Sequence, residues 1–133
     1  MKLISVDTSI IVAILSGEEH SKTFEEILSK SKPIISSVAV LEAFLVVRSD
    51  LGDRASFAIE QLLMEYGINQ VEFGQGHLTH ARAAFERFGK GNHPAKLNFG
   101  DCIVYATSKF TSTPLLFLGD DFSQTDIEAV KWA

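Results

Sequence analysis

Two short apolar runs, each followed by acidic residues, do most to limit what this chain can fold into. Residues 3–6 (Leu-Ile-Ser-Val) run directly into Asp7, and residues 115–118 (Leu-Leu-Phe-Leu) are followed by Gly119, Asp120 and Asp121. Neither run alternates regularly between apolar and polar residues, so we expect both faces of each strand to be buried. Such strands are typical of parallel sheets that are covered by helices on both sides.

Strands and helices alternate between these two runs. Besides residues 3–6 and 115–118, the pattern predicts strands at residues 34–35 and 68–73, and helices near residues 10–15, 19–30, 38–47, 54–66, 77–88 and 98–110. Asp53 is expected to cap the fourth of these helices from a turn over residues 50–53, and a last short strand is expected near Val130. We therefore predict one α/β domain over residues 1–133.

The composition fits a compact enzyme or binding domain better than a membrane protein. Hydrophobic residues make up 46% of the chain and charged residues 22%, which is enough apolar material for a core. No apolar run approaches the roughly 18 residues that a transmembrane helix needs, and residues 1–7 do not resemble a signal peptide. The single cysteine, Cys102, cannot form an intrachain disulfide. These features together favour a cytoplasmic protein that does not enter membranes.

Net charge argues mildly against a general nucleic-acid binder. The chain carries a formal charge of -5, whereas such binders are usually basic. Residues 80–96 are the exception, because they contain Arg82, Arg87, Lys90 and Lys96 against one acid, Glu86. This local charge is compatible with a phosphate-bearing substrate, and equally with a solvated helix face and loop.

Several acids are predicted to meet at one edge of the sheet. The carboxyl ends of parallel strands lie along the same edge, which is where open α/β folds bind ligands. Asp7 follows the first strand, Asp120 and Asp121 follow the last, and Glu42 lies in the second turn of the helix after the second strand. The helix that carries Asp101 follows a nine-residue loop, not a strand, so it is free to begin at this edge.

Each acid also has an ordinary structural explanation. Asp7 fits a turn or helix N-cap, and Asp120 and Asp121 fit a turn after a strand. Asp101 lies three residues after Asn98, at the capping-box position. Glu42 is harder to explain in this way, because it is the one charge in residues 38–47 and a buried carboxylate needs a partner.

Taken together, the acids point to a hard divalent cation. Clustered carboxylates repel one another unless a cation joins them, and Mg²⁺ and Mn²⁺ prefer oxygen ligands. Such an ion can activate water and stabilise charge on a phosphate. His77 and His80 have no third ligand nearby that would make a zinc pattern, and Cys102 is expected to be a small buried residue.

The chain resembles the PIN-domain ribonucleases, and within them the VapC-type toxins of bacterial toxin–antitoxin pairs. The matching segments are residues 6–9 (Val-Asp-Thr-Ser), 37–42, 97–102 (Leu-Asn-Phe-Gly-Asp-Cys) with Tyr105 and Ala106, and 115–122 with Thr125 and Asp126. The resemblance implies a three-layer α/β/α domain around a parallel sheet of four to five strands. It also implies that RNA is cleaved with Mg²⁺ or Mn²⁺ held by Asp7, Glu42, Asp101 and a fourth acid. We assign that acid to Asp120, with Asp121 as the alternative.

The resemblance further implies roles for neighbouring residues and for partners. Thr8 and Ser9 match hydroxyls at the family's site, and the loop over residues 89–96 is expected to touch the RNA backbone through Lys90, His93 and Lys96. The implied partners are a second copy of the chain and a small antitoxin, one segment of which lies over the acidic groove.

Two other classes of function remain open at this stage. A phospho-aspartyl receiver needs paired acids after its first strand, and a related phosphatase needs a second aspartate two residues after the first, where this chain has Ser9. A non-catalytic module that keeps the fold is disfavoured by the presence of all four acids. No Gly-x-x-x-x-Gly-Lys segment supports a nucleotide hydrolase.

Overall fold

A parallel sheet forms the centre of the structure, a computed structural model that describes residues 1–132. Its four strands are β1 (Lys2–Val6), β2 (Ser31–Ser36), β3 (Asn69–Val71) and β4 (Leu115–Leu116). They are hydrogen-bonded in the order β3-β2-β1-β4, and every pair is parallel. The predicted parallel α/β architecture is therefore confirmed.

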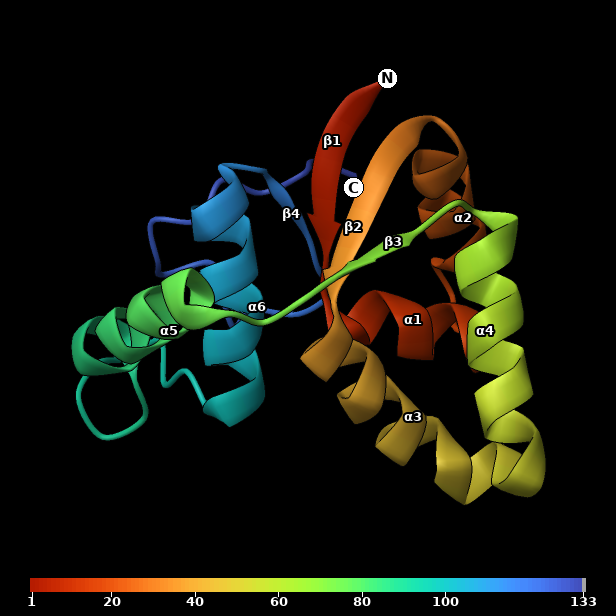
Figure 1. The fold of residues 1–133 in the computed structure, drawn as a ribbon, viewed down its shortest axis with the longest axis horizontal. Coiled ribbons are helices and arrows are strands. Elements are labelled where there is room, and N and C mark those ends of the chain that lie inside the picture. Colours follow the sequence, from red (N-terminus) through yellow and green to blue (C-terminus); the bar gives the residue numbers. More distant parts are fainter. Residues whose placement is uncertain (133) are drawn as a thin grey trace.

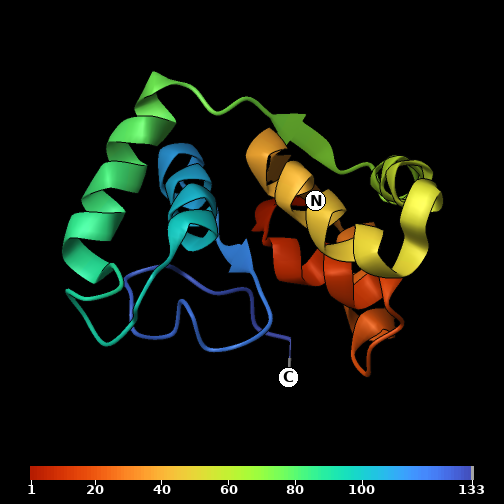
Figure 2. The same cartoon turned by 90° about the horizontal axis from the view of Figure 1, so that it is seen from below.

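Six α-helices and one 3₁₀ turn connect and cover these strands within the described residues. They are α1 (Thr8–Leu15), α2 (Ser21–Ser29), α3 (Ser37–Leu51), α4 (Ala55–Glu65), α5 (Gln75–Phe88), α6 (Phe99–Thr111) and the 3₁₀ turn Gly52–Arg54. Helices α5 and α6 lie on one side of the sheet, and α1, α2 and α4 lie on the other (Figures 1 and 2).

Helix α6 is the most enclosed element of the fold. Seven consecutive residues, 102–108, are buried, so no side of the helix faces solvent in its middle turns. A helix that is buried all round belongs to the core, and α6 packs against α5, β1 and β2. Its first turn lies at the edge of the sheet where β1 ends (Figure 1), as its position after a long loop predicted.

Two local predictions were wrong. The turn expected at residues 50–53 lies two residues later, as the 3₁₀ turn Gly52–Arg54, because α3 continues to Leu51 and is capped by Gly52. Asp53 makes no cap for α4; its carboxylate instead accepts a hydrogen bond from Arg48 at 3.2 Å. The strand expected near Val130 is reduced to a single bridge between Ala129 and Leu115, which extends the sheet beside β4.

The lengths and apolar content of the helices can be compared with those of a membrane-spanning segment. None of the helices within residues 1–132 is both long enough and apolar enough to cross a bilayer.

Candidate active site

Asp7 stands where β1 passes into α1. It is the N-cap of α1, and its Oδ2 accepts hydrogen bonds from the Ser9 backbone N–H at 3.1 Å and from Ser9 Oγ at 2.5 Å. Burial raises the pKa of Asp7 to about 6, although the two Ser9 hydrogen bonds oppose the shift, and the charges of Glu42 and Asp121 raise it further. Asp7 therefore does cap α1, and the same hydrogen bonds also fix its carboxylate at the edge of the sheet.

Ser9 connects the first and last strand ends. While its Oγ donates to Asp7, the same oxygen accepts a hydrogen bond from the Leu118 backbone N–H at 3.1 Å. Leu118 lies just beyond β4, so one hydroxyl ties the carboxyl ends of two neighbouring strands together. The segment that leads to Asp120 and Asp121 is thereby fixed beside Asp7.

Glu42 reaches the same edge from α3. Its Oε1 accepts a hydrogen bond from Thr8 Oγ1 at 2.8 Å, and Thr8 Oγ1 also lies 3.3 Å from the Ala39 carbonyl oxygen. Thr8 is buried and Glu42 is half-buried. The partner that a carboxylate in this uncharged run requires is therefore a hydroxyl, not a cation.

Gly100 allows α6 to approach the Glu42 carboxylate. A Cβ atom at this position would lie 2.4 Å from Glu42 Oε2 and 2.8 Å from Oε1, closer than real contacts allow. The first turn of α6 can therefore stand against Glu42 because residue 100 has no side chain. The sequence shows the glycine but not the reason for it, because its neighbour is 58 positions away.

Asp101 completes a capping box with Asn98. The Asp101 N–H donates to Asn98 Oδ1 at 2.9 Å, and the Asn98 N–H donates to Asp101 Oδ2 at 3.1 Å. Burial raises the pKa of Asp101 to about 7; the Asn98 hydrogen bond opposes this, and the charges of Asp121 and Asp7 add to it. The capping explanation and the functional one are both compatible with this position.

The structure brings Asp121 into the cluster. Its side chain is within hydrogen-bonding reach of Asp101, and its charge raises the pKa of both Asp101 and Asp7. Asp120 does not line the same pocket; its backbone carbonyl accepts hydrogen bonds from Ser123 N and Oγ at 3.2 and 2.7 Å. The geometry therefore favours Asp121, the alternative assignment, as the fourth acid.

One pocket of about 300 Å³ contains the acids. Its polar lining comprises Asp7, Thr8, Ser9, Glu18, Glu42, Asn98, Asp101 and Asp121, with no lysine or arginine. Glu18 was not predicted, because it lies in an ordinary loop after α1 and no motif marks it. Within residues 1–132, no ion pair is formed by Asp7, Glu42, Asp101 or Asp121.

The donor set suits a hard divalent cation. All the candidate ligands are oxygens, and the pKa values of Asp7 and Asp101 are raised mainly by burial and further by the charges of neighbouring acids. In the described part of the chain, however, no three acidic, histidine or cysteine side chains are close enough to share one ion as they stand. Asp7 and Asp101 are each turned toward a helix N-terminus, so binding requires side-chain rotation or ligation through water, which Mg²⁺ commonly uses.

Of the five residues predicted to contact substrate, Thr8 and Ser9 line this pocket, and the three on the loop over residues 89–96 lie outside it. Lys90 and Lys96 are exposed on the loop between α5 and α6. His93 helps to build that loop: its Nδ1 accepts the Ala95 N–H at 3.0 Å, and its ring packs edge-on against Phe88 at 5.1 Å between centroids. Their contact with RNA stays a prediction.

Comparison with known proteins places this architecture in one family. The family model described as "PIN domain" matches residues 4–128. The chain belongs to the PIN-domain family. Ribonuclease VapC36 of Mycobacterium tuberculosis is 39% identical over 125 residues, covering 92% of this chain and 90% of that protein.

Solved structures with the same fold are more distant in sequence. M. tuberculosis VapC20, described as a sarcin-ricin loop cleaving toxin, has a TM-score of 0.77 at 17% identity and covers 96% of this chain and 98% of its own. VapBC-1 of nontypeable Haemophilus influenzae also has a TM-score of 0.77 at 17% identity, with 98% of both chains covered. At this identity the likeness establishes the fold alone.

Proposed function

We propose that this PIN-domain protein is a divalent-metal-dependent endoribonuclease that acts as the toxin of a VapBC-type toxin–antitoxin pair. The ribonuclease class follows from VapC relatives that match nearly the whole chain. The observation that carries the mechanism is the pocket lined by five carboxylates and by no lysine or arginine, at the carboxyl edge of a parallel sheet. Such a site attracts a metal ion and, through it, a phosphate group.

Asp7, Glu42, Asp101 and Asp121 are the residues that would hold Mg²⁺ or Mn²⁺. When bound, the ion would lower the pKa of a water molecule and offset negative charge on the scissile phosphate. Asp7 and Asp101 line the pocket from two helix N-termini, where the macrodipoles favour anionic groups. Thr8 and Ser9 orient Glu42 and Asp7 through the hydrogen bonds described above.

Substrate binding would rest on the exposed loop between α5 and α6. Lys90 and Lys96 would contact RNA phosphates beside the start of α6, and His93 would mainly hold the loop in shape. Because such contacts are electrostatic, substitution of both lysines by glutamine should weaken RNA binding and its dependence on salt. The rate at saturating RNA should change little.

Two protein partners accompany this function. An antitoxin segment would cover the acidic pocket, with a basic side chain among the carboxylates. A second copy of the chain would cover the apolar groove of about 540 Å³ between α3, α5 and α6, where Phe99, Leu78 and Phe85 are 77%, 48% and 45% exposed. Phe85→Glu should then convert a dimer to a monomer in light scattering. The cytoplasm, where RNA is available, is the compartment consistent with this role.

A cleavage assay tests the proposal directly. Purified protein should cut single-stranded RNA with Mn²⁺ or Mg²⁺ and lose this activity when a chelator is added. Failure to cut any RNA, by antitoxin-free protein shown to be folded by circular dichroism, would overturn the enzymatic proposal.

Comparing Asp121→Asn with Asp120→Asn tests the assignment of the fourth acid. The two residues are adjacent and both exposed, so the variants change the protein's charge equally. We expect Asp121→Asn to lower kcat by about 10- to 100-fold and Asp120→Asn to keep most of the activity. The reverse order would return the role to Asp120.

A further inference from the structure

The segment that carries Asp121 has little regular structure of its own. Between β4 and the Ala129 bridge, residues 117–128 contain no helix or strand. Gly119 adopts a φ of 103°, and isolated turns join Ser123 to Asp120 and Thr125 to Phe122. Asp121 itself is exposed. Its position therefore depends on what anchors the segment on either side.

The first anchor is apolar. Phe122 is 2% exposed, and its ring lies 5.2 Å from that of Phe117. This contact holds the residue next to Asp121 in the core. A single buried ring does not by itself fix the rotation of the neighbouring residue, because the backbone dihedrals on either side of it remain free.

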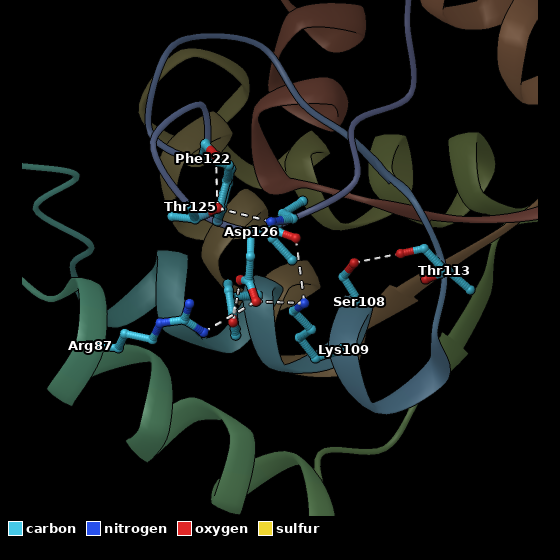
Figure 3. A network of polar contacts seen from close by, with 9 residues as sticks. Arg87, Ser108, Lys109, Thr113, Phe122, Thr125 and Asp126 are labelled. Carbon is cyan, nitrogen blue, oxygen red and sulfur yellow. Dashed lines mark hydrogen bonds and ion pairs between the residues drawn. The ribbon is translucent and has the colours of Figure 1, made fainter.

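The second anchor is a polar cluster around Asp126, drawn in Figure 3. Tyr105 OH donates to Asp126 Oδ1 at 2.6 Å, while Lys109 Nζ and Arg87 Nη1 lie 2.9 and 3.3 Å from Oδ2. These donors come from two helices, Arg87 from α5 and the others from α6. Thr125 tightens the turn before it, accepting the Ile127 N–H at 3.2 Å and donating to the Phe122 carbonyl at 2.7 Å.

The helix that receives this anchor is the helix that carries Asp101. Tyr105 follows Asp101 by four residues, one turn along α6, so the two side chains lie on the same face. A displacement of Asp126 relative to Tyr105 therefore changes the distance between Asp121 and Asp101.

We propose that Asp126 is a positioning residue, whose contacts with Tyr105, Lys109 and Arg87 hold the 117–126 segment so that Asp121 faces Asp101. This inference rests on the proposed function of the carboxylate pocket. The role is indirect: Asp126 lines a different pocket, farther along α6, and the lining of that pocket shares no residue with the acidic one.

Hydrogen exchange and Mn²⁺ binding of Asp126→Asn test this role. Asparagine keeps the shape of the side chain but loses both ion pairs. We expect amides of residues 118–127 to exchange about tenfold faster or more, and Mn²⁺ affinity, measured by calorimetry without RNA, to fall by about 10- to 100-fold. The KM for RNA should stay near that of the unsubstituted protein, while kcat falls.

Asp53→Asn is the matched control. Asp53 also pairs with an arginine, Arg48, at 3.2 Å on the surface, but lies in the 3₁₀ turn that follows α3 and does not line the acidic pocket. It should leave both exchange in residues 118–127 and Mn²⁺ affinity unchanged. Should Asp126→Asn fail to fold, Tyr105→Phe removes one hydrogen bond with no change in charge and should give the same effects at smaller size.

The outcomes separate the two proposals. Unchanged exchange in residues 118–127 would overturn the anchoring by Asp126, whatever the activity. Faster exchange with unchanged Mn²⁺ affinity would show that the segment does not position a metal ligand, which also overturns the inference. An unsubstituted protein that neither binds Mn²⁺ nor cuts RNA would instead overturn the proposed function.

Discussion

Two clusters of polar side chains lie at successive positions along α6, one around Asp101 and one around Asp126, and their aspartates are in opposite environments. Asp126 is surrounded by Tyr105, Lys109 and Arg87, and although burial acts against it, these donors lower its pKa. Asp101 faces further carboxylates, and burial and their charges raise its pKa to about 7. An aspartate is therefore paired with donors in one cluster and surrounded by other acids in the other.

The difference separates a structural role from a functional one. A carboxylate that only stabilises the fold is expected to find cations or several donors, as Asp126 does. Repulsion between crowded carboxylates lowers the stability of the metal-free protein. Such repulsion is expected at a functional site, where a bound ligand relieves it. Substitutions in the two clusters test this contrast.

Asp7→Asn should break the acidic cluster most severely. It removes the carboxylate that we propose as a metal ligand at the end of β1, so RNA cleavage should fall by about 10³-fold or more. The asparagine can still cap α1, so the melting temperature of the metal-free protein should stay equal or rise. Measurement combines single-turnover cleavage with thermal unfolding. Retained cleavage would remove Asp7 from the site.

Gly100→Ala should displace Glu42 without changing any charge. The added methyl group would meet the carboxylate at 2.4 Å, so the carboxylate must move. A shift of about 1 Å at a catalytic group can cost about 100-fold in rate, and we expect a loss of 10- to 100-fold. In a Glu42→Gln background the same substitution should cost much less, because the two changes act on one group. Equal losses in both backgrounds would contradict this link.

Ser9→Ala should have a smaller effect on the same cluster. It removes the hydroxyl that joins Asp7 to the Leu118 backbone but leaves the Ser9 N–H on Asp7. Loss of one orienting hydrogen bond should lower kcat by about tenfold or less and stability by about 1 kcal/mol. Ser9→Thr retains the hydroxyl, so it should keep most of the kcat, measured by cleavage, and most of the stability, measured by urea unfolding.

The pH dependence of stability should have opposite signs in the two clusters. The folded-state pKa values of Asp7 and Asp101, about 6 and about 7, lie above the ordinary 3.8. Their stabilising contribution to the free energy of unfolding is therefore fully present below about pH 4 and is lost as pH rises through 6 and 7. The pKa of Asp126 is lowered, so its contribution is present above about pH 4 and is lost as pH falls through its folded-state value.

Two variants separate these contributions. Asp101→Asn should raise the stability of the metal-free protein at pH 8 by on the order of 1 kcal/mol, allowing for solvent screening, and flatten its pH profile. Asp126→Asn should lower stability at pH 8 by a similar or smaller amount and have less effect at pH 3.5. Thermal unfolding across pH 3.5–8.5 measures both, and parallel profiles for the two variants would contradict the contrast.

Sequence alone predicted the elements that follow simple rules. Strands that are apolar on both faces predicted the parallel sheet, and the common direction of its strands predicted that Asp7 and Glu42 would meet at one edge. The long loop before Asn98 predicted that Asp101 would join them. In each case a local pattern and one rule of topology were sufficient.

The remaining features depend on tertiary contacts. Whether Asp120 or Asp121 enters the pocket is set by the path of an irregular segment after Gly119, and that path depends on Phe122 and Asp126. Glu18 carries no local signal, and the space that Gly100 leaves for Glu42 exists only once α3 and α6 are packed. Asp53 was misassigned because α3 continues past the position where its apolar pattern ends.

The hydrogen bond from the Leu118 backbone to Ser9 has a consequence for the protein while it is being made. It joins residues 109 positions apart, and Asp121 comes later still. A nascent chain that has left the ribosome only as far as α6 holds Asp7, Glu42 and Asp101 but lacks β4, one of the two strands beside β1, and Asp121. A protein that cuts RNA is therefore assembled in an order that keeps it incomplete during most of its own translation.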